Sequence, residues 1–129
     1  MKPLLEVLNL SVDFLKKKGI ESPRLNAEEL IAHCLEISRT QLYMEFDRPL
    51  SERELECCRN LLSRRSQGEP LSYILGCVDF LNCIIHVNGS VLIPRLETEL
   101  LAERIVNEIK SEPYAGKYLL DLCSGSGCL

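Results

Sequence analysis

The residues best suited to chemistry lie near the end of the sequence, where a short apolar run meets a glycine-rich turn. Residues 118–122 read Tyr-Leu-Leu-Asp-Leu, and they are followed by Cys123, Ser124, Gly125, Ser126 and Gly127. An apolar run broken only by Asp121 predicts a strand buried on both faces of a parallel sheet. Glycines directly after such a strand let the backbone approach a bound nucleoside and turn its amide groups toward it. The segment therefore predicts a nucleoside-binding turn.

The spacing of this turn separates the possible ligands. Asp121, Gly125 and Gly127 form an Asp-x-x-x-Gly-x-Gly pattern, of the kind used for S-adenosylmethionine. A phosphate-binding loop needs lysine and then serine or threonine after the last glycine, and Cys128 excludes that version. A dinucleotide-binding turn needs a glycine after Leu129, so this alternative stays open. A turn that only joins a strand to a helix also stays open.

A second group of candidates precedes an expected helix. Glu97 and Glu99 could act as catalytic carboxylates, but the attraction of acidic side chains to a helix N-terminus explains them more simply. Arg95 and Thr98 either border a ligand pocket or cap the helix and fix the preceding loop. The histidines, His33 and His86, have no clustered partners, so we expect no metal site.

The seven cysteines are read as reduced thiols. Their number is odd and no Cys-x-x-Cys pair occurs, so the sequence favours neither a disulfide framework nor a zinc site. Cys57 and Cys58 are adjacent and would point to different sides of a helix. We therefore expect no redox role for them.

The elements that must position these residues begin with a string of helices over residues 1–70. Leucines at helical spacing predict a first helix that ends at Gly19 after three lysines. A second helix is expected to begin with Ser22 as its N-cap and a proline in its first turn. Two more helices should start at Ser38 and Ser51, each of which is followed three residues later by glutamine or glutamate. This region predicts an all-helical bundle.

After residue 70 the periodicity changes. Residues 71–87 are rich in Ile, Val and aromatic residues and predict a β-hairpin or an extended linker. Residues 88–129 contain an amphipathic helix and then the apolar run described above. One buried parallel strand needs neighbouring strands that these residues do not supply. We therefore expect an amino-terminal fragment of a longer protein, with domains at 1–70, 71–87 and 88–129.

Three segments of the sequence resemble one known family, the peptide-chain release-factor glutamine methyltransferases, also called the PrmC or HemK family. The first is Gly68-Glu69-Pro70 with Tyr73, Ile74, Gly76 and Phe80 after it. The second is Val-Leu-Ile-Pro-Arg-x-Glu-Thr-Glu at residues 91–99, and the third is the turn at residues 121–127. The resemblance covers the whole chain. Leu96 stands where the family usually has proline, and Cys123 where glycine is most frequent, which the turn tolerates if the φ of Cys123 is negative.

The resemblance implies an α/β protein: an all-helical N-terminal bundle and a β-hairpin linker, followed by the start of a Rossmann-like S-adenosylmethionine methyltransferase domain, truncated after its first strand. The family methylates the side-chain amide of glutamine in the Gly-Gly-Gln loop of release factors. The implied cofactor-binding residues are Asp121, Cys123, Ser124, Gly125, Ser126 and Gly127, with Arg95 and Thr98 as a possible pocket border. The family's catalytic Asn-Pro-Pro-Tyr segment does not occur, so we expect these 129 residues alone to be inactive.

Composition limits the partners. The net charge is -4, with 46% hydrophobic and 26% charged residues, so direct binding to nucleic acid is not expected. No stretch reaches the length of a membrane span, and a cytoplasmic monomer that acts on release factors is expected. Two alternatives remain: a helical protein-binding module with a vestigial methyltransferase segment, and a dinucleotide-dependent oxidoreductase.

Overall fold

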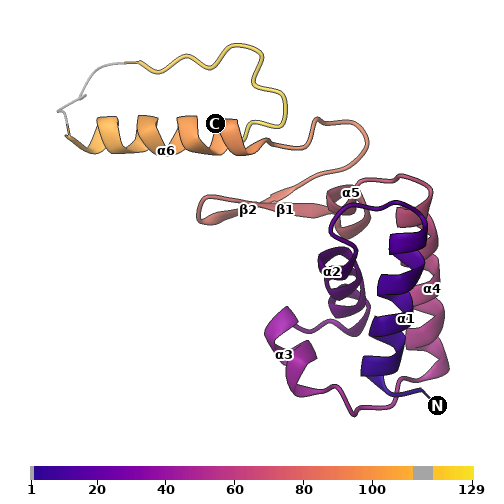
Figure 1. Ribbon diagram of the computed structural model, residues 1–129. Coiled ribbons are helices and arrows are strands. Elements are labelled where there is room, and N and C mark those ends of the chain that lie inside the picture. Colours follow the sequence, from indigo (N-terminus) through magenta and orange to yellow (C-terminus); the bar gives the residue numbers. More distant parts are fainter. Residues whose placement is uncertain (1, 112–117) are drawn as a thin grey trace. The chain divides into compact units, whose positions relative to one another are not determined.

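The computed structural model describes residues 2–111 and 118–129. They form two compact units, one up to Leu75 and one from Gly76 onward, and each is described by itself. The first unit contains only helices and the second contains a hairpin and a helix (Figure 1). No helix in the described ranges combines the length and the apolar character that a membrane crossing requires.

Helix α2, Pro23–Leu35, is the centre of the first unit and packs against its other four helices. The sequence predicts one apolar stripe of five residues on this helix. Ala27, Leu30, Ile31 and Leu35 are buried as expected, whereas Cys34 is only partly buried. Asn26, Glu28 and Ala32 are buried as well. The buried surface is wider than a stripe because neighbours surround the helix on several sides.

Helix α1, Leu4–Lys17, buries Leu4, Leu8 and Leu15 against α2 and α4, Glu52–Ser66. It ends as predicted, because Gly19 takes a φ of +73° and Ile20 N donates to Leu15 O at 3.1 Å. The positive φ of the glycine and this hydrogen bond are both typical of a helix that ends at a glycine. The predicted first helix and its stop are confirmed.

The two predicted capping boxes are confirmed. Ser38 caps α3, Arg39–Met44, and Ser51 caps α4; each serine side chain accepts from the backbone of Gln41 or Glu54, whose side chain accepts in return. At Ser22 the predicted position is confirmed, because Ser22 is the N-cap residue of α2 and Pro23 opens the helix, but the serine side chain does not act as the cap. Ser22 lies in the left-handed region, with φ 49°, and its side chain makes no capping hydrogen bond. The fixed φ of a proline in the first turn starts the helix without it.

The segment after Pro70 corrects a second prediction. Residues 71–75 were expected to be extended, but Leu71–Leu75 is helix α5. The Pro70 carbonyl accepts from Tyr73 N and Ile74 N, and Ile74 is buried in the core of the first unit. Burial of apolar side chains at helical spacing therefore prevails over the strand preference of Tyr and Ile.

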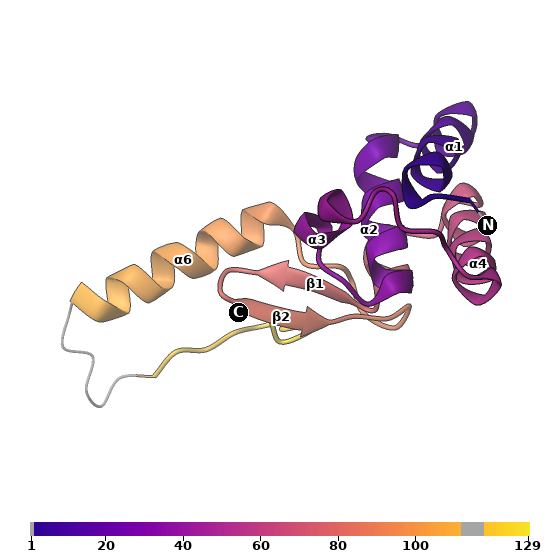
Figure 2. The ribbon, with the colours of Figure 1, turned by 90° about the horizontal axis from the view of Figure 1, so that it is seen from below.

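The second unit starts with a hairpin (Figure 2). Strand β1, Cys77–Phe80, pairs antiparallel with β2, Cys83–His86, so that Phe80 faces Cys83 across a two-residue turn. Leu81 in that turn has a φ of +53°. The predicted hairpin is confirmed over these residues.

Helix α6, Leu96–Ser111, follows the hairpin as predicted, with Glu97 and Glu99 in its first turn. Its apolar side chains are largely exposed, and only Ala102 is buried. The strand predicted at residues 118–122 is wrong for this structure, because those residues form no strand and Tyr118 is fully exposed. A strand needs hydrogen bonds from a neighbour, and the sheet found among the described residues contains only β1 and β2.

The cysteine prediction also needs correction. Cys34 on α2 and Cys57 on α4 form a disulfide, with their Cα atoms 5.9 Å apart, and the other five cysteines are free. Close packing of α2 on α4 places the two residues side by side, which spacing in the sequence could not reveal. Burial, with a further contribution from the Glu54 charge, raises the pKa of the neighbouring Cys58 thiol to about 11.

Candidate functional site

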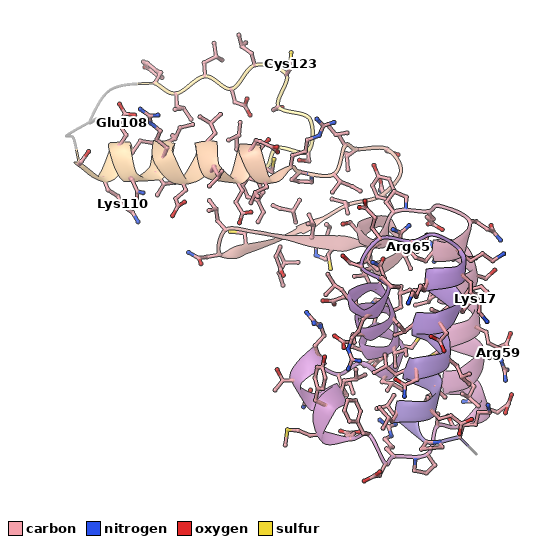
Figure 3. The ribbon with its side chains drawn as sticks, viewed as in Figure 1. Lys17, Arg59, Arg65, Glu108, Lys110 and Cys123 are labelled. Atoms are coloured by element: carbon pink, nitrogen blue, oxygen red, sulfur yellow. A yellow bond between two sulfur atoms is a disulfide. The ribbon has the colours of Figure 1, made fainter. Side chains whose placement is uncertain are left out.

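One cavity in the second unit collects most of the predicted site residues. Its volume is about 430 Å³, within the size range of small-molecule sites. Seven of the eight predicted positions line it, namely Arg95, Thr98, Asp121, Cys123, Ser124, Gly125 and Ser126. Gly127 does not line it. Segments far apart in the sequence therefore meet where the motifs indicated, and Figure 3 labels Cys123 on one of them.

The first wall of the cavity is the start of α6. The Arg95 carbonyl accepts from Thr98 N at 3.0 Å and from Glu99 N at 3.2 Å, so Arg95 fixes the first helical turn through its backbone. Ile93 and Pro94 continue this wall. Arg95 and Thr98 therefore lie at the border of this cavity, and the two hydrogen bonds belong to the first turn of α6 itself.

The second wall is the glycine turn. Gly127 N donates to Ser124 O at 2.9 Å and closes the turn around Gly125 and Ser126. Because this amide is used inside the turn, it is not available to a ligand. Gly125 has a φ of +57°, and a Cβ there would meet its nearest neighbour, Cys123 O, only at 3.9 Å. The backbone conformation, rather than lack of space, therefore requires glycine at this position.

The backbone of Cys123 does not have the negative φ that its side chain was expected to need. A small side chain was acceptable there if φ were negative, but φ is +60°. This conformation costs a residue with a Cβ roughly 1–2 kcal/mol. The structure thus explains why glycine is the better residue at this place in the turn.

A contact that sequence reasoning missed lies beside the cavity. Leu81 N, in the hairpin turn, donates to Glu99 Oε1 at 2.6 Å. The motif Glu97-Thr98-Glu99 gave no sign of this contact, because the partner is a backbone amide 18 residues away. Glu97 is exposed, in agreement with the helix-terminus explanation.

The first unit holds a second group that was missed. Glu28 on α2 is 1% exposed and accepts hydrogen bonds from Arg24, Arg39 and Tyr43. Burial acts to raise the pKa of Glu28, but the hydrogen bonds from Tyr43, Arg39 and Arg24 outweigh it and lower that pKa below its usual value. The four-residue spacing of Arg24 and Glu28 was a readable signal. This cluster joins α2 to α3, and none of its residues lines the cavity.

The described residues offer no group of three His, Cys, Asp or Glu side chains arranged to hold a metal ion. The residues that line the cavity include one acidic, one basic and two hydroxyl-bearing residues, namely Asp121, Arg95, Ser124 and Ser126. These suit a ligand that carries both a positive and a negative charge. Together, the described residues combine a packed helical unit with a cavity of small-molecule size in the second unit.

Comparison with known proteins identifies the module. Residues 6–76 match the family model described as the PrmC N-terminal domain, and the chain belongs to that family. The match ends within one residue of the boundary between the two units.

Curated relatives match nearly the whole chain. Proteins named release factor glutamine methyltransferase from Leptospira interrogans, Geobacter sulfurreducens and Chlorobaculum tepidum are 44%, 41% and 38% identical to it over 126, 124 and 129 residues. These alignments cover 98%, 96% and 98% of this chain, but only 44%, 42% and 44% of the relatives. The chain therefore spans less than half the length of these relatives. Their names favour neither the vestigial module nor the oxidoreductase.

Proposed function

We propose that this chain carries the substrate-docking unit and the first part of the cofactor pocket of an S-adenosylmethionine-dependent methyltransferase. The proposed substrate is the glutamine side-chain amide in the Gly-Gly-Gln loop of peptide chain release factors. The helical unit up to Leu75 docks the release factor, the hairpin follows it in the sequence, and residues 88–129 begin a Rossmann-like methyltransferase domain. The observation that carries the proposal is the cavity in which Arg95 and Thr98 meet residues 121–126, in a chain whose residues 6–76 match the PrmC N-terminal domain.

The groups in the cavity fit the methionine part of S-adenosylmethionine. The Asp121 carboxylate complements its ammonium group and the Arg95 guanidinium complements its carboxylate. The hydroxyls of Ser124 and Ser126 add neutral donors and acceptors. When bound, the cofactor supplies an electrophilic methyl group. An acidic partner for the ribose hydroxyls is not among the cavity residues, so the fit concerns the methionine part alone.

The chemistry demands further groups. An amide nitrogen is a weak nucleophile because its lone pair is delocalised, so its NH₂ group must be held by hydrogen-bond acceptors close to the methyl carbon. By resemblance to the family, an Asn-Pro-Pro-Tyr segment provides them. That segment does not occur among these 129 residues. The proposed activity therefore belongs to a chain that also carries the part of the relatives outside the alignment.

A chimera tests the proposal. Residues 1–129 are joined to the remaining part of the Leptospira interrogans relative, which is 44% identical over the shared region. We expect the chimera to transfer the labelled methyl group of S-adenosylmethionine to a release factor, with the label on the Gly-Gly-Gln glutamine by mass spectrometry. A release factor with alanine at that position should stay unlabelled. An inactive chimera beside an active parent enzyme would overturn the proposal.

Two variants of the chimera localise the functions. Gly125→Val should abolish cofactor binding because of the left-handed backbone, whereas Gly89→Val should not, since Gly89 has no positive φ and open space around its Cβ position. Deletion of residues 1–75 should raise the KM for the release factor more than the KM for S-adenosylmethionine. Equal rises would contradict the docking role of the helical unit.

A further inference from the structure

The hydrogen bond from Leu81 N to Glu99 Oε1 ties the turn of the hairpin to the first turn of α6. Both elements belong to the unit that starts at Gly76. An N–H bond to a carboxylate is charge-assisted and stronger than a neutral one. Thr98, the residue before Glu99, lines the cavity. One helical turn therefore borders the cavity and holds the hairpin.

The hairpin needs such an anchor. Its strands have four residues each, and a two-stranded hairpin is marginally stable at best in water. Leu81 also has a φ of +53°, a conformation that persists in a leucine only when the surroundings hold it. The bond to Glu99 fixes that backbone at its strained position.

Position on the helix distinguishes Glu99 from Glu97. Successive α-helical residues are 100° apart, so side chains two positions apart point to nearly opposite sides. Both carboxylates are placed to interact with the helix N-terminus, but the hydrogen bond to the hairpin is made by Glu99. Glu97 is thus a matched control for any effect of charge at this terminus.

We propose that Glu99 is a positioning residue that holds the hairpin turn at the border of the cofactor cavity, so that the hairpin can guide the release-factor loop toward it. This inference rests on the proposed function. Leu81 and Ile84 remain 37% and 65% exposed on the hairpin, which leaves apolar side chains for a protein substrate to contact. Glu99 itself touches neither the cavity nor the reacting atoms.

The contact is tested first in the 129-residue chain, without any activity. Amide hydrogen exchange followed by nuclear magnetic resonance should show a protected Leu81 amide. Glu99→Ala should speed its exchange at least tenfold, Glu99→Gln should retain much of the protection through its amide oxygen, and Glu97→Ala should leave it unchanged. An unprotected Leu81 amide in the unaltered chain, or an equal effect of Glu97→Ala, would overturn the proposal.

The positioning role is tested in the chimera. Glu99→Ala should raise the KM for the release factor about fivefold or more, change the KM for S-adenosylmethionine less than twofold, and be rescued in large part by Glu99→Gln. An unchanged KM for the release factor, or equal rises in both constants, would overturn it. If the unaltered chimera is inactive, the proposed function fails and the positioning role fails with it, whereas the exchange experiment still decides whether Glu99 anchors Leu81.

Discussion

Glu28 is a carboxylate placed where charge is costly, in a helix surrounded by other helices. Arg24 Nε donates to it at 2.9 Å and Arg39 at 2.8 Å, and the Tyr43 hydroxyl donates to the oxygen that Arg24 contacts. Arg24 and Arg39 are themselves about half exposed, so the charge is shared with solvent through them. Arg39 and Tyr43 fix α3 on α2 through their hydrogen bonds to Glu28.

The lowered pKa of Glu28 makes the stability of the helical unit depend on pH. A carboxyl group whose pKa is lower when folded contributes stability above its unfolded value, 4.5, and this contribution is lost as pH falls through the folded value. Thermal melts by circular dichroism from pH 7 to pH 3 should show this loss. Glu28→Gln should lower the free energy of unfolding by about 1–3 kcal/mol at pH 7, and the stability of this variant should fall less between pH 7 and pH 3. Glu56 is exposed, so Glu56→Gln should change neither the stability at pH 7 nor its loss in acid. A Glu28→Gln variant that loses as much stability in acid as the unaltered protein would contradict the prediction.

A substitution at Cys123 is expected to strengthen cofactor binding. Replacing it with glycine removes the cost of its φ of +60°. In the chimera, Cys123→Gly should lower the Kd for S-adenosylmethionine about three- to tenfold, measured by calorimetry. Cys123→Ala is the control, since it removes the thiol but keeps a Cβ at the same positive φ and should not strengthen binding. Equal or weaker binding by Cys123→Gly would show that the turn is not strained when the cofactor binds.

At the scale of elements, α5 determines where the first unit ends. Ile74 is 6% exposed, and Leu71 and Leu75 pack against the same core. Burying one such side chain stabilises by about 1.5–3 kcal/mol. A chain of residues 1–75 should therefore unfold cooperatively at a higher urea concentration than a chain of residues 1–70. Identical midpoints would mean that α5 adds nothing to the core.

The disulfide between α2 and α4 should stabilise the same unit. Its cysteines are 23 residues apart in the sequence. Closing a loop of this length lowers the entropy of the unfolded chain and so stabilises the folded state by about 3 kcal/mol. Urea unfolding with and without a phosphine reductant should show a loss of about this size. The double variant Cys34→Ser/Cys57→Ser should not respond to the reductant.

Thiol counting gives an independent reading of the same bond. Alkylation of the unfolded, non-reduced protein should modify five cysteines, and seven modified cysteines would contradict the bond. In the folded protein Cys58 should resist alkylation, because burial keeps its pKa at about 11 and its thiolate scarce at neutral pH.

Local patterns predicted the elements whose causes are local. The helix stop at Gly19 and the capping boxes at Ser38 and Ser51 depend on residues within one turn, and all were readable. Helix α5 and the Cys34–Cys57 bond depend on tertiary packing, which no window of the sequence contains. For the cavity, the motifs gave seven of its lining residues, but not the Leu81–Glu99 contact, which joins two distant segments.

At the scale of the whole molecule, the described cavity is expected to be insufficient for binding. The turn that forms one wall follows residues 118–122, which lie outside any sheet and are exposed, so the turn lacks the rigid support that a binding site requires. Calorimetry of the 129-residue chain with S-adenosylmethionine should show no heat of binding at micromolar concentrations, whereas the chimera should bind. Micromolar binding by the 129-residue chain would show that the sheet is not needed.

The two units differ sharply in how much apolar surface they hide. The first buries a continuous core, whereas α6 keeps Leu100, Leu101 and Ile109 about half exposed, and residues 119 and 120 are more exposed still. Proteases begin at stretches that open easily, and low burial makes opening easy. Degradation of this chain should therefore start in the second unit and leave the helical unit as a long-lived remnant. The cavity of the second unit and the helical unit would then be lost at different rates.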